Sequence, residues 1–262
     1  MSVSRLFVEA DLAPGVEAPL AADQVHYLCH VMRLTEGAHL VLFNGRDGEW
    51  RATLALRGRK AAVARIGTQT RQQSGEPDLW LCFAPIKRAR IDFLTEKATE
   101  LGVAVLQPVL TRHTAVERVK VERLRANAIE AAEQTERLTV PEVRAMTELA
   151  RLLEAWPAGR RLLICDETGG GAPIAETLGA LDAAARAAPW AILTGPEGGF
   201  ASSELAALRR MKDVVSVGLG PRILRADTAA VAALACWQAM IGDWRKPTPR
   251  LSSDYRSSRL TA

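Results

Sequence analysis

The sequence predicts an α/β protein with two unequal parts, a small β-rich domain at residues 1–72 and a larger domain at residues 73–244. Two observations lead to this division. The first part holds short apolar segments separated by Asn-Gly and Asp-Gly turns, which are typical of β-hairpins. In the second part, apolar strand segments alternate with helical ones, which is typical of a parallel sheet. A chain of 262 residues, 48% of them hydrophobic, can bury a core in each part.

The N-terminal part is predicted to be a small β-barrel with one helix. Its strands are expected at residues 5–8, 40–43, 50–56 and 61–66. Asp23 is a candidate helix N-cap, and Gly37 follows the last apolar residue of the helical pattern. That pattern consists of Val25, Leu28, Cys29 and Met32. The polar segment 68–77 is expected to link the two parts.

The second part is predicted to form a parallel sheet with helices on both faces. Strands are expected at 79–84, 103–106, 161–165, 190–194 and 214–219, and helices at 89–101, 121–137, 145–155, 174–186, 202–211 and 227–243. Ligands of such sheets bind beyond the carboxyl ends of the strands. Three loops therefore form the candidate site, at 165–173, 194–204 and 218–228.

The positive charge is concentrated at the C-terminus. Residues 245–262 carry a charge of +4, equal to that of the whole chain, so the first 244 residues are neutral overall. This Ser- and Arg-rich tail is expected to be disordered. RNA binding would therefore depend on local basic segments, of which 112–125 and 87–90 are the strongest. Solvated helix faces are an equally good interpretation of either segment.

Other classes of protein are disfavoured. No stretch of about 18 apolar residues suits a membrane span, and no signal peptide is recognisable, so a cytoplasmic protein is expected. The four cysteines have no metal-ligand spacing. His26 and His30 are four residues apart but lack a third ligand, so no metal is expected.

The second and third candidate loops suit a ligand with a flat base. Glycines in "TGPEGGF" (194–200) allow a ligand to approach the backbone, and the run is neither a dinucleotide fingerprint nor a Walker motif. The third loop offers the backbone amides of Leu219 and Gly220 and an apolar slot from Ile223 and Leu224. Such a slot suits adenine better than a pyrophosphate. Tight turns in an α/β sheet are the alternative.

These loops carry a resemblance to a known family. "GPEGGF" followed by "GLGPRILRADTA" resembles the cofactor loops of the SPOUT methyltransferases. With "HYLCHVMRLTEG" (26–37), "KATELGV" (97–103) and "EAAEQTERLTVP" (130–141), the chain is similar to the 16S rRNA (uracil-N3) methyltransferase family, small-subunit methyltransferase E. The resemblance implies a PUA-like N-terminal barrel and a C-terminal SPOUT domain with a trefoil knot. It also implies S-adenosylmethionine as methyl donor and a homodimer with active sites at the subunit interface.

The family's activity is S-adenosylmethionine-dependent methylation of N3 of a specific uridine in 16S rRNA of the small ribosomal subunit. The cofactor-binding residues that the resemblance and the loops indicate are Leu193, Thr194, Gly195, Pro196, Glu197, Gly198, Gly199, Val217, Leu219, Gly220, Ile223, Leu224, Arg225 and Thr228. The chain departs from the family at two positions. His113 lies where arginine is common, and Asp227 lies where glutamate is usual.

Transfer to uracil N3 needs a group that stabilises the uracil anion, and arginine suits this role because it stays cationic and presents several donors. Arg225 is the first catalytic candidate, followed by Arg5 and Arg222. Glu197 is the only carboxylate in the glycine loop. It is either the base or a carboxylate that stabilises the loop.

The candidate RNA-binding residues are Arg5, Arg33, Lys87, Arg90, Arg112, Arg118, Lys120, Gln134, Arg137 and Arg222. Glu130, Gln134 and Arg137 share one face of the predicted helix 121–137, either as surface ion pairs or facing the reaction site. Two alternatives to the family's activity remain open. One is a SPOUT enzyme that modifies tRNA or a ribose 2′-hydroxyl, and the other is a non-catalytic RNA-binding assembly factor.

Overall fold

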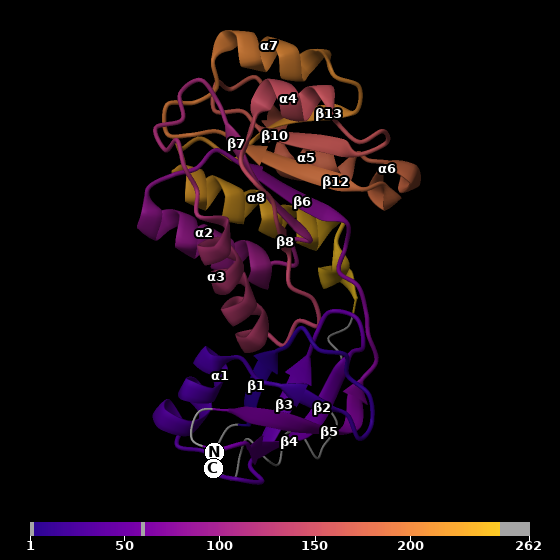
Figure 1. Cartoon of the computed structure of the whole chain (residues 1–262). Coiled ribbons are helices and arrows are strands. Elements are labelled where there is room, and N and C mark those ends of the chain that lie inside the picture. The colour runs from indigo at the N-terminus through magenta and orange to yellow at the C-terminus, as the bar shows by residue number, and fades with distance from the viewer. Residues whose placement is uncertain (1–2, 59–60, 247–262) are drawn as a thin grey trace. The chain divides into compact units, whose positions relative to one another are not determined.

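The computed structural model describes residues 3–58 and 61–246, which divide into two compact units (Figure 1). The first unit contains the described residues up to Gly75 together with Ala132–Val140. The second contains Glu76–Ala131 and the described residues from Pro141 onward. The expected disordered tail lies outside the described residues from position 247 onward. Residues 132–140 thus belong with the N-terminal strands, although 56 residues separate them in sequence from Gly75.

The first unit is built on a five-stranded sheet in the order β1-β3-β4-β5-β2. Its strands are β1 (Ser4–Phe7), β2 (Glu17–Pro19), β3 (His39–Phe43), β4 (Glu49–Leu56) and β5 (Ala62–Arg71). Only β1 and β3 run parallel, and the other pairs are antiparallel. The helix α1 (Ala22–His26) continues as a π-helical turn, η1 (Tyr27–Val31), and contributes Val25 and Leu28 to the core.

Three local predictions for this unit are wrong. The expected linker begins too early, because residues 68–71 form the end of β5 and the backbone of Arg71 pairs with Glu49 in β4. Polar strand ends without an apolar face give no signal in the sequence pattern. Strand β2 was not expected. The helix begins after Ala21 rather than Asp23, and the side chain of Gln24 accepts the Ala21 N–H at 3.1 Å.

The second unit is built on a parallel sheet in the order β11-β13-β10-β12-β6-β7-β8, with β9 paired to β7. Its strands are β6 (Leu79–Phe83), β7 (Val105–Leu110), β8 (Glu142–Val143), β9 (Thr147–Glu148), β10 (Arg161–Cys165), β11 (Ala172–Pro173), β12 (Trp190–Thr194) and β13 (Val214–Gly218). The predicted parallel sheet is confirmed, because every pair in it is parallel.

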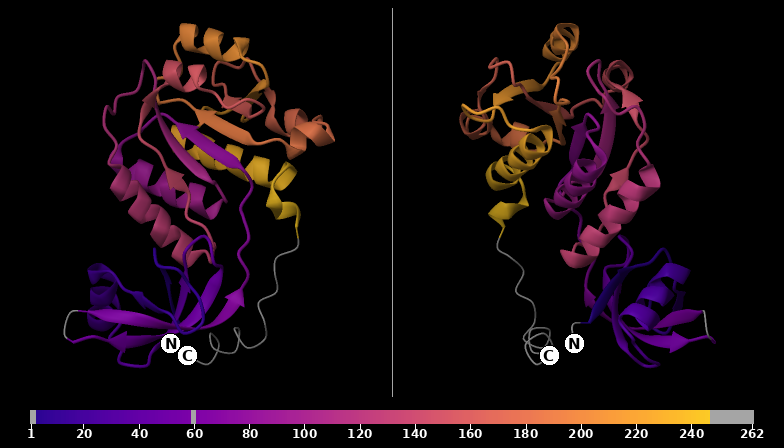
Figure 2. Two further views of the ribbon diagram at one scale, coloured as in Figure 1. Left: turned by 45° about the vertical axis from the view of Figure 1, so that its right-hand side comes forward. Right: turned by 90° about the vertical axis from the view of Figure 1, so that its left-hand side faces the viewer.

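Alternate side chains of the strands fill two cores, so helices cover both faces (Figure 2). In β6, Leu79, Leu81 and Phe83 pack in one core, whereas Trp80 and Cys82 pack in the other. The first core is closed by α2 (Arg88–Glu100), α3 (Val121–Gln134), α5 (Ile174–Gly179) and α8 (Ala226–Met240). The second is closed by α4 (Leu149–Glu154) and α7 (Ser202–Arg210).

Three expected helices are clearly shorter than predicted. The expected helix 145–155 begins only at Leu149, because Thr147 and Glu148 form β9 and pair with β7. Helix α3 ends at Gln134 rather than residue 137, because Glu136 takes a left-handed backbone with φ of 62°. The expected helix 174–186 is interrupted after Gly179, and α6 (Ala183–Ala187) starts afresh with Asp182 accepting the Ala185 N–H at 2.7 Å. A short helix η2 (Asp243–Arg245) follows α8. The trefoil knot stays a prediction.

Candidate functional site

The loops that follow β10, β12 and β13 surround a cavity of about 390 Å³ in the second unit. These are the three loops that the sequence places at the carboxyl ends of the strands, and parallel pairing brings those ends to one edge of the sheet. The volume lies in the range of small-molecule sites. The described part of the chain therefore offers one ligand-sized site built from these three loops.

Most of the predicted cofactor-binding residues line this cavity. They are Thr194, Gly195, Pro196, Glu197, Gly199, Val217, Leu219, Gly220, Ile223, Leu224 and Arg225. Arg222, which was expected to bind RNA, lines it as well. The backbone turns at Gly199 and Gly220 require left-handed φ angles of 68° and 95°, which glycine adopts without strain.

Three predicted residues do not line the cavity. Leu193 is 1% exposed, and its side chain packs in the core closed by α4 and α7. At Gly198, a Cβ would lie 3.1 Å from the Cβ of His113, so this glycine leaves room for the His113 side chain. Thr228 lies in the first turn of α8, where its N–H donates to the carboxylate of Asp227 at 3.0 Å.

The loop after β10 supplies two carboxylates that sequence reasoning missed. Asp166 accepts hydrogen bonds from the N–H of Thr168 at 2.9 Å and from Arg209 at 2.7 Å. Burial of its carboxyl opposes ionisation, but the bonds from Thr168 and Arg209 outweigh burial and lower the pKa of Asp166. Glu167 accepts the Phe200 N–H at 3.1 Å, so it is the carboxylate that stabilises the glycine loop. The sequence signal that could have found Asp166 and Glu167 is their position directly after a predicted strand.

The wall of the cavity also has apolar and cationic parts. Leu219, Ile223 and Leu224 form an apolar side, and Ile223 is 93% exposed at its rim. Arg225 is the N-cap residue of α8, and its exposed guanidinium has no hydrogen-bond or ion-pair partner among the described residues. Cys165 is buried, which raises the pKa of its thiol to about 12, so a thiolate plays no part here. The cavity can hold a flat apolar group beside a cationic one.

A short loop after β7 is fastened to the glycine loop. The Nδ1 atom of His113 lies 3.0 Å from the carbonyl oxygen of Gly198 and 3.2 Å from that of Gly199. The N–H of Arg112 donates to Glu204 in α7 at 2.9 Å, and the N–H of Thr111 donates to Thr114 Oγ1 at 2.9 Å. His113 is exposed, and it contacts Gly199, which lines the cavity.

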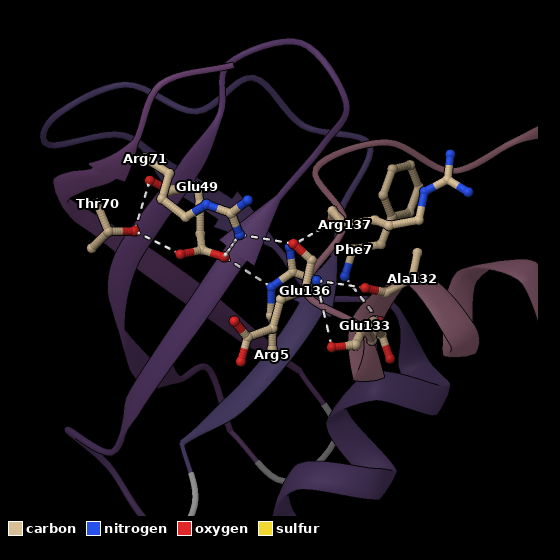
Figure 3. A network of polar contacts seen from close by, with 9 residues as sticks. All are labelled: Arg5, Phe7, Glu49, Thr70, Arg71, Ala132, Glu133, Glu136 and Arg137. Atoms are coloured by element: carbon tan, nitrogen blue, oxygen red, sulfur yellow. Dashed lines mark hydrogen bonds and ion pairs between the residues drawn. The ribbon is translucent and has the colours of Figure 1, made fainter. Parts of the chain in front are cut away.

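Arg5 does not take part in this site, which corrects its two predicted roles. Its side chain is buried in the first unit, where Nε donates to Glu49 Oε2 at 2.9 Å and Nη1 donates to the Ala132 carbonyl at 2.8 Å (Figure 3). Nη2 donates to the Arg137 carbonyl, and the guanidinium stacks on Phe43 with 3.8 Å between its carbon and the ring centroid. All three nitrogens of the guanidinium donate hydrogen bonds inside the first unit, so neither catalysis nor RNA contact is proposed for Arg5.

The other predicted RNA-binding residues are divided between the units. Lys87, Arg112, Arg118 and Lys120 are exposed in the second unit, where Arg90 is half-buried. Arg33 and Gln134 are exposed in the first unit. Arg137 is only 7% exposed, so it is not a surface contact for RNA, and it lies beyond the end of α3 instead of on the expected helix face.

Among residues 3–58 and 61–246, no group of three or more His, Cys, Asp or Glu side chains could hold a metal ion. None of the described helices is long and apolar enough to cross a membrane.

Both parts of the chain match known families. Residues 74–238 match the family described as RNA methyltransferase domain, and residues 20–67 match the RNA methyltransferase PUA domain. The predicted fold class, a PUA-like β domain followed by an α/β domain with a parallel sheet, is therefore confirmed.

Named relatives cover nearly the whole chain. Ribosomal RNA small subunit methyltransferase E of Rickettsia conorii is 33% identical over 90% of this chain and 95% of its own length. The Synechocystis protein of the same name is 32% identical over 90% of this chain and 78% of its own length. Among solved structures, the Neisseria gonorrhoeae protein of that name, bound to S-adenosylmethionine, is 27% identical with a TM-score of 0.79, covering 92% of this chain and 99% of its own. A methyltransferase from Legionella pneumophila with the same cofactor is 26% identical with a TM-score of 0.81, covering 93% and 100%.

Proposed function

We propose that this chain, which belongs to the ribosomal RNA small subunit methyltransferase E family, transfers a methyl group from S-adenosylmethionine to N3 of a specific uridine in 16S rRNA. The observation that carries the proposal is the cavity that the three loops form at the carboxyl edge of the sheet. Solved relatives of the same architecture hold S-adenosylmethionine. A substrate in the small ribosomal subunit also agrees with the expected cytoplasmic location of the enzyme.

The residues of the cavity fit the chemistry of this donor, which supplies a methyl group on a cationic sulfonium. The slot of Leu219, Ile223 and Leu224 suits the flat adenine ring, and neighbouring backbone amides can hydrogen-bond to its edge. Glu167 and Glu197 place carboxylates in the same wall, where they favour a cationic ligand. No metal is needed for this binding or for the transfer.

Arg225 is the residue proposed to stabilise the reacting base. When N3 of uracil loses its proton, negative charge spreads over O2 and O4, and a planar guanidinium can donate to such oxygens. Arg225 lines the cavity, and its donors are free of other described residues. Arg222 lines the cavity too and is exposed, so it suits a contact with the RNA backbone. Glu197 is exposed in the same wall and is the first candidate to accept the proton.

The enzyme is further proposed to act as a homodimer through α8. Ala230, Ala233, Leu234 and Trp237 of this helix are buried against its own sheet. Thr228, Ala232, Ala235 and Ala239 recur at helical spacing on another side, where the side chains are half-buried or exposed. Small residues allow a second copy of the helix to approach closely. Sedimentation at micromolar concentration tests this proposal, and a fully active monomer would refute it.

The function is tested with 30S subunits and 16S rRNA from a strain that lacks the corresponding methyltransferase. Purified protein and S-adenosylmethionine should convert one uridine to N3-methyluridine, as located by mass spectrometry of RNA fragments. Methylation of tRNA or of a ribose 2′-hydroxyl would replace the substrate assignment. Binding of RNA without methyl transfer to any nucleotide would favour a non-catalytic assembly factor.

A further inference from the structure

We propose that His113 is the general base that removes the N3 proton of uracil, a role that rests on the proposed function and replaces Glu197 in it. The ring of His113 lies beside the glycine loop, with Nδ1 at 3.0 Å from the Gly198 oxygen and 3.2 Å from the Gly199 oxygen. Gly199 lines the cavity, so the imidazole is held next to the candidate reaction site.

These two contacts select one tautomer of the ring. Carbonyl oxygens only accept hydrogen bonds, so Nδ1 must carry the proton that they receive. In neutral imidazole the other nitrogen, Nε2, then has an unprotonated lone pair. Since the side chain is exposed, Nε2 can meet a substrate from solution and afterwards release its proton to water. The geometry thus presents a base whose proton-accepting atom is defined.

The surrounding residues hold this ring in place. The backbone N–H of Arg112 donates to Glu204 Oε1 at 2.9 Å, while Glu204 Oε2 accepts the Ala201 N–H at 2.8 Å. One carboxylate therefore fastens the loop of His113 to the beginning of α7. Gly198 leaves room for the ring, because a Cβ there would lie 3.1 Å from the Cβ of His113. A base must be positioned in this way if it is to work in the transition state.

Imidazole also suits the task better than the carboxylate of Glu197. General bases work best when they titrate near the working pH, and histidine changes charge between about pH 5 and 8. In the proposed step, the N3 proton moves to Nε2, the N3 electron pair forms the bond to the donor's methyl carbon, and the carbon–sulfur pair stays on sulfur. The imidazolium then returns the proton to solvent.

The charged groups on the segments next to His113 come from four elements. They are Arg112 on its own loop, Glu197 in the glycine loop, Glu167 in the loop after β10 and Glu204 in α7. If His113 is the base, the single-turnover rate should rise with pH and then level off, because only a neutral imidazole can accept the N3 proton. If His113 acted as a cation instead, the single-turnover rate would fall as the pH rises.

The decisive variant is His113→Asn, because the asparagine amide can donate to the Gly198 carbonyl in place of Nδ1–H but has no Nε2. We expect its transfer rate at saturating donor and RNA to fall about 10²-fold or more, with unchanged donor affinity by calorimetry. Its rate should keep rising with pH, because hydroxide then replaces the lost base. The matched control is His39→Asn, an exposed histidine at the start of β3, which should keep the wild-type rate.

A second readout is independent of turnover. Nitrogen-15 NMR of the protein without donor or RNA should show His113 as the Nδ1–H tautomer, assigned by its loss in His113→Asn. An Nε2–H tautomer, or His113→Asn at the wild-type rate, would overturn the proposal. Loss of rate in Glu197→Gln with no loss in His113→Asn would restore Glu197 as the base. If wild-type protein methylates no uridine at all, the proposed function itself fails and this role fails with it.

Discussion

Arg5 and Glu49 form a buried ion pair, with 2.9 Å between Nε and Oε2 and with less than 10% of either side chain exposed. The pair connects β1 to β4, and the rest of the Arg5 guanidinium binds the carbonyls of Ala132 and Arg137. Glu49 is also held by Thr70 at 3.0 Å and lies 3.5 Å from Arg71. Through these contacts the first unit incorporates residues 132–140 (Figure 3).

Breaking this pair should destabilise the first unit strongly. Arg5→Ala leaves the Glu49 carboxylate buried beside fewer donors, and Glu49→Gln leaves a buried guanidinium without its counter-ion. Each change should lower the free energy of unfolding by about 3–5 kcal/mol, measured by urea denaturation. The control is Arg46→Ala, because the Arg46–Asp11 pair is exposed at 51% and 90%, and its loss should cost less than about 1 kcal/mol.

A conservative change in the same pair tests whether the role of Arg5 is structural or catalytic. Arg5→Lys keeps a cation near Glu49 and should fold, although less stably. Its transfer rate at saturating donor and RNA should stay within about twofold of wild type at a temperature where it is folded. A large loss of rate in this folded variant would contradict the structural assignment.

Gly199→Ala should weaken donor binding. The backbone at Gly199 has a φ of 68°, and an added Cβ would lie 2.2 Å from Glu167 Oε1, which accepts the Phe200 N–H. Either the Glu167 carboxylate must give up its hydrogen bond to Phe200 or the loop must shift, and both changes disturb the glycine loop where it lines the cavity. We expect at least tenfold weaker binding of S-adenosylmethionine by calorimetry, a loss of about 1.4 kcal/mol or more.

Gly15→Ala is the matched control for this change. Gly15 has a similar φ of 78° in the first unit, but its added Cβ would meet no atom within 4 Å. Both variants should lose roughly 1–2 kcal/mol of stability from left-handed strain. Only Gly199→Ala should lose affinity for the donor. Equal affinities in the two variants would show that the glycine loop does not touch the ligand.

Arg225→Ala should lower kcat far more than it weakens RNA binding, because the proposed contact with the uracil anion strengthens in the transition state. The expected loss is on the order of 10²–10³ in single-turnover rate. Arg225→Lys should recover only part of it, since an ammonium cannot reproduce the planar pair of donors. Arg210→Ala, at the exposed end of α7, serves as the control and should retain the rate. Loss of RNA affinity with an unchanged rate would make Arg225 a binding residue.

The exposed segment that contains Arg118 and Lys120 should behave in the opposite way. Replacing both with glutamine should weaken RNA binding and reduce its salt dependence by roughly 0.7–0.9 in log–log slope for each lost phosphate contact. The transfer rate at saturating RNA should change little. Lys212→Gln, an exposed residue between α7 and β13, is the control, and equal salt slopes in the two proteins would exclude the segment from the RNA interface.

The main strands and helices of the second unit and the place of the cavity could be predicted from the sequence. Buried parallel strands are short apolar runs, and the helices between them show their own spacing, so the order of β6, β10, β12 and β13 is readable along the chain. Gly195, Gly198 and Gly199 follow β12, and the apolar pair Ile223 and Leu224, flanked by Arg222 and Arg225, follows β13. The three loops accordingly meet at one cavity, as their position after the strands predicts.

What individual polar residues contact was decided only by the tertiary structure. Arg5 was a catalytic candidate because an arginine can stabilise the uracil anion, but its donors are bound by partners 44 to 132 positions away in the chain. Gly198 accommodates His113, which lies 85 residues earlier, and Glu167 rather than Glu197 stabilises the glycine loop. Local spacing determines strands, helices and turns because these depend on neighbours in sequence. The role of a charged or polar side chain depends on which distant donors and acceptors folding brings within about 3 Å of it, and no local pattern encodes that distance.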